Sequence, residues 1–164
     1  MNWETVEDAI IAKLQPSMTT ANVDVDHVPE NEDDLKKAIS RPRVWVAYNG
    51  TEYNPSKSAS AQAIVQDGTT TFEIVIQSKK LRGNKGCYIV MELVKLLLTG
   101  FKAAEELNPL YLIKEELLQF DNQGVWNYRQ IYSCKMTQIQ KDDGAVDVIL
   151  QQITMNTTEV TNGF

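Results

Sequence analysis

A chain of 164 residues is long enough for one domain with a real hydrophobic core, because a domain of about 150 residues buries roughly 68–70% of its unfolded surface. Its hydrophobic content of 43% and charged content of 23% are ordinary for a soluble globular protein, and no leader-like hydrophobic stretch follows Met1, which points to a protein made and kept in the cytoplasm. The formal net charge of -6 argues against a general nucleic-acid binder, since such proteins use cations to neutralise phosphates.

The first predicted element is an amphipathic helix. Apolar residues recur at helical spacing from Trp3 to Leu14. Asn2 is placed to cap the first turn, and Pro16 follows the last apolar position. We therefore expect the helix to end near Pro16 and residues 17–22 to form a loop.

An acidic run follows a short predicted strand at residues 23–25. Four of its residues carry groups that can bind metal ions: Asp24, Asp26, His27 and Glu30. Their spacing matches no EF-hand or HExxH motif. Asn31 can cap a short helix whose first turn, with Asp33 and Asp34, is acidic and suits the helix dipole. We expect a solvated acidic surface and no metal site.

Two strands are predicted to pair antiparallel. Residues 44–48 are rich in β-branched and aromatic side chains, and residues 72–77 alternate, with Phe72, Ile74 and Ile76 on one face. Between them, residues 49–68 are rich in Ser, Ala, Thr, Asn and Gly, which is long for a hairpin connection. We expect these residues to form a mobile projecting arm.

The stretch from Gly83 to Phe101 contains the strongest helix signal. No proline or glycine interrupts residues 87–98, and Gly100 is placed to cap the C-terminus. Only a narrow stripe is polar: Tyr88, Glu92, Lys95 and Thr99. The helix is too short to span a bilayer, which takes about 20 apolar residues. We expect the chain's own sheet to cover one apolar side and a second copy of the chain to cover another.

Four cations gather just before this helix: Lys79, Lys80, Arg82 and Lys85. Backbone amides at a helix N-terminus together with lysines can hold a phosphate, but the motif GxxxxGK[ST] is absent. We interpret the segment as a subunit or partner interface, where a basic loop meets an acidic surface of a neighbour. The predicted interface also includes Asp33 and Asp34 of the acidic run and Tyr53 of the arm.

Two further strands, residues 110–120 and 125–136, are joined by a predicted hairpin turn at residues 121–124. One face of the second strand should pack on the central helix: Trp126, Tyr128, Tyr132, Cys134 and Met136. Cys87 and Cys134 lack CxxC spacing, which favours free buried thiols. Residues 146–153 could form one more strand or an arm, and residues 156–164 a frayed tail.

The sequence contains no recognisable catalytic motif. His27 is the only histidine and lies among acids, and no GxSxG elbow surrounds a serine. The adjacent carboxylates Glu115 and Glu116 would point to opposite faces of a strand. We therefore expect no catalytic residue and no cofactor, and a protein that is not an enzyme.

These elements predict an α/β (α+β) fold. A single mixed, mainly antiparallel sheet of four to five strands would be packed by the central helix and the N-terminal helix. Residues 1–140 are expected to form this domain, and residues 141–164 a C-terminal extension.

Five stretches of sequence resemble one known family. VEDAIIAKL, RVWVAYNGTEY, FEIVIQSKKLRG, GCYIVMELVKLLLTGF and GVWNYRQIY occur in an order that resembles the small tail-associated proteins of Mu-like phages and prophages, the family named after the thirty-seventh gene product of phage Mu. Such proteins are similar in size and layout to the tail terminators of long-tailed phages. The resemblance covers residues 3–139.

The resemblance implies a structural protein of the virion tail, assembled in the cytoplasm of a bacterial host. Tail terminators form a ring, usually of six copies, that caps the tail tube, stops its polymerisation and offers a surface to the head. The implied partners are further copies of the chain, the tail tube protein and head–tail connector proteins. DNA would pass through the ring without specific binding, and no membrane is involved.

Two other functions stay open at this stage. A head–tail connector, or neck protein, would share the ring and differ only in its partner. A small nucleotide-binding module or enzyme would instead use the loop from Lys79 to Gly86 to hold a phosphate.

Overall fold

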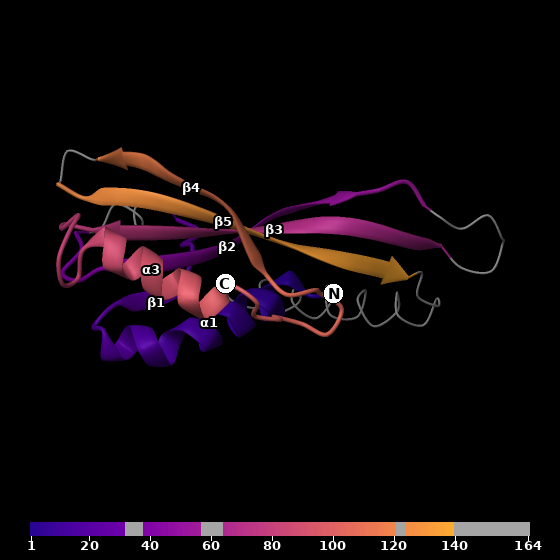
Figure 1. The fold of residues 1–164 in the computed structure, drawn as a ribbon, viewed down its shortest axis with the longest axis horizontal. Coiled ribbons are helices and arrows are strands. Elements are labelled where there is room, and N and C mark those ends of the chain that lie inside the picture. Colours follow the sequence, from indigo (N-terminus) through magenta and orange to yellow (C-terminus); the bar gives the residue numbers. More distant parts are fainter. Residues whose placement is uncertain (32–37, 57–63, 121–123, 140–164) are drawn as a thin grey trace, which may run out of the picture.

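A computed structural model of the protein describes residues 1–31, 38–56, 64–120 and 124–139. Five strands form one sheet in the order β1-β2-β3-β5-β4, with the bounds β1 Asp24–His27, β2 Arg43–Tyr53, β3 Val65–Ser78, β4 Tyr111–Phe120 and β5 Trp126–Ile139. β1 pairs parallel with β2, and every other pair is antiparallel. Two helices, α1 (Trp3–Thr20) and α3 (Cys87–Leu98), cover the same face of the sheet (Figure 1). The predicted fold class is confirmed.

Helix α1 begins where the sequence predicts and ends later. The side chain of Asn2 accepts a hydrogen bond from the backbone N–H of Glu4 at 3.0 Å, so the predicted cap is confirmed. The predicted end at Pro16 is wrong, because the helix continues to Thr20. Proline costs the helix one hydrogen bond, but Met18 extends the buried stripe by one more turn. Residues 17–20 are therefore helix and not loop.

The predicted antiparallel pairing of β2 with β3 is confirmed, and both strands are longer than expected. Residues 49–53 and 65–68, assigned to an arm, are paired strand, with a bulge between Tyr48 and Gly50. The β-branched residues Thr51, Thr69 and Thr70 favour this extension, which the Ser- and Asn-rich composition conceals. Residues 57–63 lie outside the described part.

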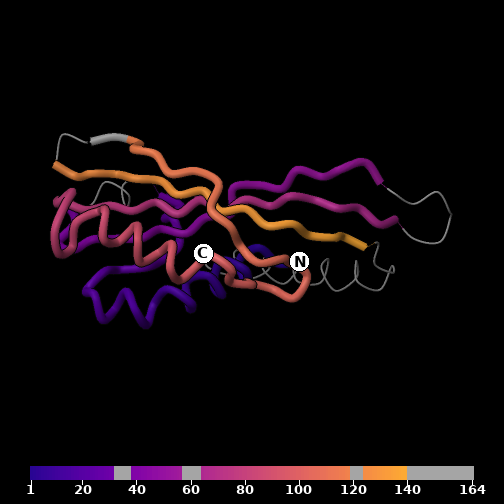
Figure 2. Tube along the Cα trace, in the orientation of Figure 1, coloured from indigo at the N-terminus to yellow at the C-terminus, as the bar shows by residue number. Residues whose placement is uncertain are grey.

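The extended strands form a feature that we call the ribbon: residues 51–53 of β2, 65–70 of β3 and 135–139 of β5. Figures 1 and 2 show these residues continuing past both helices, at the opposite end of the sheet from the N-terminus of α3. The connection from α3 to β4 passes beneath the ribbon on the helical side, where Leu107 bridges to Met136.

The core lies between the helices and the sheet. β3 turns Phe72, Ile74 and Ile76 inward, as predicted from their alternation. The predicted inward face of β5 is also confirmed, since its five residues all belong to or pack against the same core cluster. Gln130 lies on that face as well, and its amide donates to the carbonyl of Met91 in α3.

The predictions for the pairing of β4 and for the two cysteines are confirmed. The predicted pairing of β4 with β5 is confirmed, whereas its turn at residues 121–123 lies outside the described part. Cys87 and Cys134 are free and buried, as expected, and burial raises the pKa of each thiol to about 11.

Two further predictions lie outside the described part of the chain. One is the extension, within residues 140–164, and the other is the acidic pair Asp33 and Asp34, within residues 32–37. Among the described residues, no helix has the length and hydropathy to cross a bilayer.

Candidate interaction surfaces

The basic loop, residues 79–86, leads from β3 into α3 and has a fixed backbone. The N–H groups of Cys87 and Tyr88 donate to the carbonyls of Lys80 and Leu81, at 2.9 and 3.2 Å. The buried hydroxyl of Ser78 donates to the carbonyl of Lys85 at 2.7 Å and accepts from the N–H of Lys80. The side chains of Lys79, Lys80, Arg82 and Lys85 are exposed. The loop therefore displays four cations from an ordered base.

The two glycines of this loop are required by its shape. Gly83 has φ +74°, in the left-handed region. At Gly86 the constraint is space, because a Cβ there would lie 2.7 Å from the carbonyl carbon and oxygen of Arg82. Both glycines thus serve to hold the loop in one conformation.

Replacing Gly86 with alanine is expected to lower the free energy of unfolding by about 1–3 kcal/mol, as overpacking at crowded sites does. The clash is with backbone atoms, which cannot turn away as a flexible side chain would. Urea unfolding followed by circular dichroism measures the effect. Asn84→Ala, at an exposed position in the same loop, should change stability by less than about 0.5 kcal/mol. Equal stabilities of the two variants would contradict the close packing.

A small hollow of about 190 Å³ lies beside the basic loop. Its lining combines cations with an apolar floor: Arg41, Lys79, Lys80 and Lys85, with Ile39 and Pro42. Arg41 already pairs with Asp24 at 2.8 Å, which leaves the lysines as the charge available to a ligand. Such a hollow suits a carboxylate or a phosphate. Because the first amides of α3 are bonded within the loop, the helix N-terminus contributes less to phosphate binding than a P-loop does.

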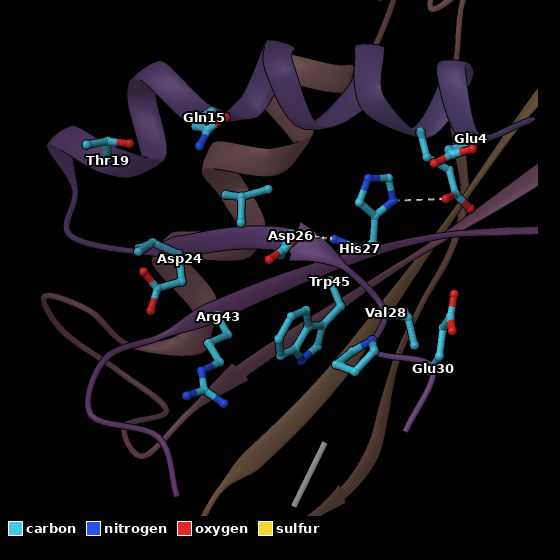
Figure 3. A pocket seen from close by; sticks show the side chains of 14 residues that line it. Glu4, Gln15, Thr19, Asp24, Asp26, His27, Val28, Glu30, Arg43 and Trp45 are labelled. Atoms are coloured by element: carbon cyan, nitrogen blue, oxygen red, sulfur yellow. Dashed lines mark hydrogen bonds and ion pairs between the residues drawn. The ribbon is translucent and has the colours of Figure 1, made fainter. Parts of the chain in front are cut away.

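A larger acidic groove, of about 1020 Å³, lies between α1 and β1. Figure 3 shows Glu4, Asp24, Asp26 and Glu30 spread around this groove, not gathered at one point. The four potential metal-binding residues noted in the sequence are thus not brought together as ligands. No group of three or more potential metal-binding side chains occurs in the described part of the chain.

His27 is bound by two carboxylates of α1. Its Nδ1 lies 3.0 Å from Oε2 of Glu7, and its Nε2 lies 3.0 Å from Oδ1 of Asp8. The other oxygen of Glu7 accepts from the backbone N–H of Tyr48 in β2. The histidine and Glu7 therefore tie α1 to β1 and β2, a role that sequence spacing does not reveal.

This arrangement predicts a pH dependence. Burial lowers the pKa of His27, but the hydrogen bonds and charges of Glu7 and Asp8 outweigh it, so the net pKa is raised above 6.5. The stabilisation of the fold by these two contacts of His27 is then complete below about pH 6.5 and is lost as the pH rises through the folded-state pKa of His27. His27→Asn should cost more stability at pH 5.5 than at pH 8.5, by less than about 1 kcal/mol as for an exposed pair. Urea titrations that give the same loss of unfolding free energy for His27→Asn at both pH values would contradict this pH dependence.

Helix α3 presents a second apolar side, which we call the α3 stripe: Ile89, Leu93 and Leu96. Ile89 is 56% exposed and Leu96 79% exposed, while Leu93 is half-buried. Their spacing of four and three residues places them on one side of the helix. The opposite side, centred on Val90 and Val94, packs on β3 and β5. The predicted cover by the sheet is confirmed, and cover by a second copy stays a prediction.

The predicted interface residues do not gather in one place on a single copy. Tyr53 is 44% exposed on the ribbon, where its ring approaches Gly68, whereas the basic loop follows Ser78 at the other end of β3 (Figure 2). Asp33 and Asp34 lie outside the described residues. The exposure of Ile89 and Leu96 agrees with the second apolar side expected for this helix, although the sequence pattern did not tell which residues line that side, and the exposure of Ile139 was missed.

Comparisons with known proteins address the family. A family model described as "Gp37 protein" matches residues 10–157. No curated protein matches the chain. One matching solved structure is a chain of the "Virion of native gene transfer agent (GTA) particle", with 10% sequence identity, coverage of 80% of this chain and 94% of that chain, and a TM-score of 0.49. The family match begins at residue 10, continues past residue 139, where the sequence resemblance ends, and covers most of the chain, so the protein belongs to the Gp37 family.

Proposed function

We propose that this Gp37-family protein is a structural component of a phage or prophage tail, and that it acts as a tail terminator. Copies would form a ring, with six as the expected number, that caps the tail tube and joins it to head–tail connector proteins. The α3 stripe carries the proposal, because two strongly exposed aliphatic side chains beside a packed helix face mark a surface for a neighbour.

The basic loop supplies the polar part of this contact. The small hollow beside Lys79, Lys80 and Lys85 suits a carboxylate of a neighbour. Acidic candidates are Asp33 and Asp34 and the rim of the acidic groove, where Glu30 makes no ion pair with the described residues. Such charge complementarity orients a contact more than it strengthens it. Residues 141–164 are proposed as an extension that contacts a partner protein.

The test combines purified protein with tail tubes of the same phage or prophage. Mass photometry should show a defined oligomer, and negative-stain electron microscopy should show rings at tube ends. A protein that stays monomeric at high concentration, even with tubes present, would overturn the proposal. Binding to connector proteins without capping of tubes would instead assign the protein to the neck.

A nucleotide-binding role is the second candidate, because three lysines line the small hollow. Thermal unfolding with nucleotides, with and without divalent cations, separates the two roles. A specific ligand present at 100 times its dissociation constant should stabilise the fold by about 2.7 kcal/mol. No shift at that excess would exclude this site as a nucleotide pocket.

A further inference from the structure

The inward face of β5 carries one buried amide among apolar side chains. Gln130 is 0% exposed and lies in the middle of this face, whose other members are Trp126, Tyr128, Tyr132, Cys134 and Met136. Its Nε2 donates to the carbonyl oxygen of Met91 at 3.1 Å and to Oε1 of Glu115 at 2.7 Å. Its Oε1 accepts from the hydroxyl of Tyr132 at 3.3 Å. Both polar atoms of the amide therefore have partners, as their burial requires.

These hydrogen bonds connect three elements of the fold. Gln130 belongs to β5, Met91 to the middle of α3 and Glu115 to the edge strand β4. The carboxylate of Glu115 also lies 3.4 Å from Nζ of Lys95, one turn after Met91 in α3. The helix, which lies along β5 in Figure 1, is thus tied by polar contacts to two neighbouring strands.

Helix α3 needs such contacts because it is apolar on two sides. Val90 and Val94 face the sheet, whereas Ile89 and Leu96 of the α3 stripe face solvent. Hydrophobic burial depends on the area removed from water and has no direction. A rotation of α3 about its axis that turned the stripe inward would bury larger side chains than the two valines. Apolar burial alone therefore does not determine which side of α3 faces the sheet.

The amide of Gln130 does distinguish the two orientations. A hydrogen bond weakens steeply when its distance and angle are wrong, and the carbonyl of Met91 reaches Gln130 only in the observed rotation of the helix. A rotated α3 would leave the buried amide without this partner, at a cost in free energy. The basic loop fixes where α3 begins, through the N–H of Cys87, whereas Gln130 acts on the middle of the helix.

We propose that Gln130 is a positioning residue, which holds α3 in the one rotation that turns the α3 stripe outward. Single buried polar side chains fix the register of helices in coiled coils by the same physical means. In this protein the consequence is that the stripe is available to a neighbouring copy. That consequence rests on the proposed function, whereas the orientation of the helix does not.

A double variant tests the orientation. Gln130→Met with Tyr132→Phe removes the amide and the hydroxyl together, so no buried polar group loses its partner, and the midpoint of urea unfolding should stay the same or rise. The chain's two cysteines serve as reporters, because Cys87 on the inner side of α3 and Cys134 on β5 are both 0% exposed. A thiol reagent under native conditions should label Cys87 at least about tenfold faster than in the wild type, with Cys134 still protected.

Two controls make the labelling specific. Tyr132→Phe alone keeps both hydrogen bonds that Gln130 donates and should label like the wild type. Val94→Cys adds a reporter further along the buried side of α3. Rotation of the helix exposes the reporters at positions 87 and 94 together, and fast labelling at both supports the proposal. Fast labelling at position 87 alone would indicate fraying of the first turn and would overturn it.

Sedimentation velocity then tests the consequence for assembly. The double variant should self-associate at least about tenfold more weakly than Tyr132→Phe, because the α3 stripe is no longer held outward. A double variant whose Cys87 stays protected would overturn the positioning role and leave the proposed function standing. Fast labelling with unchanged association would remove the stripe from the contact between copies. A wild-type protein that stays monomeric even with tail tubes would overturn the proposed function, and the labelling would still decide the role of Gln130.

Discussion

Replacing Phe72 with alanine is expected to lower the free energy of unfolding by about 3–5 kcal/mol, the usual cost of emptying a buried phenylalanine site. Phe72 is 0% exposed at the middle of β3, the strand at the centre of the sheet. Its ring meets those of Trp3 and Tyr48 edge-on, with centroids 6.3 and 6.0 Å away. Trp3 stacks on Tyr48 at 4.2 Å, so the cavity would undermine the contact between α1 and β2 as well.

The control for this substitution lies on the same strand. Val75→Ala changes a half-exposed residue on the sheet face opposite the helices and should cost less than about 1.5 kcal/mol. Guanidinium unfolding measures the loss of unfolding free energy in both variants, provided that the m-value stays the same. A loss below about 1.5 kcal/mol for Phe72→Ala would mean that α1 is not anchored through this aromatic cluster.

Elements defined by local spacing could be predicted from sequence. The run without proline or glycine in residues 87–98 is α3 residue for residue, and Gly100 has the φ of +81° that its capping position requires. The alternation in β3 correctly divided inward from outward side chains, and the predicted inward face of β5 packs on the core, although Asn127 and Ser133 on its other face are buried as well. In each case the period of the pattern matches the period of the element, so no long-range information is needed.

Features that depend on distant contacts could not be predicted. Pro16 ends a helix by local rules, yet burial of Met18 keeps α1 helical to Thr20. The composition of residues 49–68 suggests a loop. The first end of this segment nevertheless pairs with β3, and its last end is part of β3 and pairs with β5, so both ends are strand. In both cases tertiary packing outweighs a weak local preference.

The candidate surfaces show the same division. The four cations before α3 are evident from sequence, but the Ser78 hydroxyl that fixes their loop is not. Its bonds reach the carbonyl of Lys85, seven residues away, and no spacing rule marks such a pair. Likewise, the separation of Tyr53 from the basic loop follows only from the register along β3.

Reversing two charges of the basic loop should weaken self-association while the monomer stays folded. Lys80→Glu together with Arg82→Glu changes exposed side chains only, and the backbone bonds that hold the loop remain available. The matched control, Lys13→Glu with Lys102→Glu, makes the same change in net charge at exposed positions elsewhere. Sedimentation velocity measures association of both proteins, and circular dichroism checks their folding.

We expect the loop variant to associate about tenfold or more weakly than the control at 0.1 M salt, since attraction at two exposed pairs is replaced by repulsion. The gap should narrow at about 1 M salt, where the Debye length falls from about 10 Å to about 3 Å. Equal weakening of both variants would attribute the effect to net charge and remove the loop from the contact. Loss of association that persists at high salt would instead mean that these side chains act through packing, as the stems of long cations can. Only a loss confined to the loop variant and screened by salt fits a loop that meets carboxylates of a neighbouring copy.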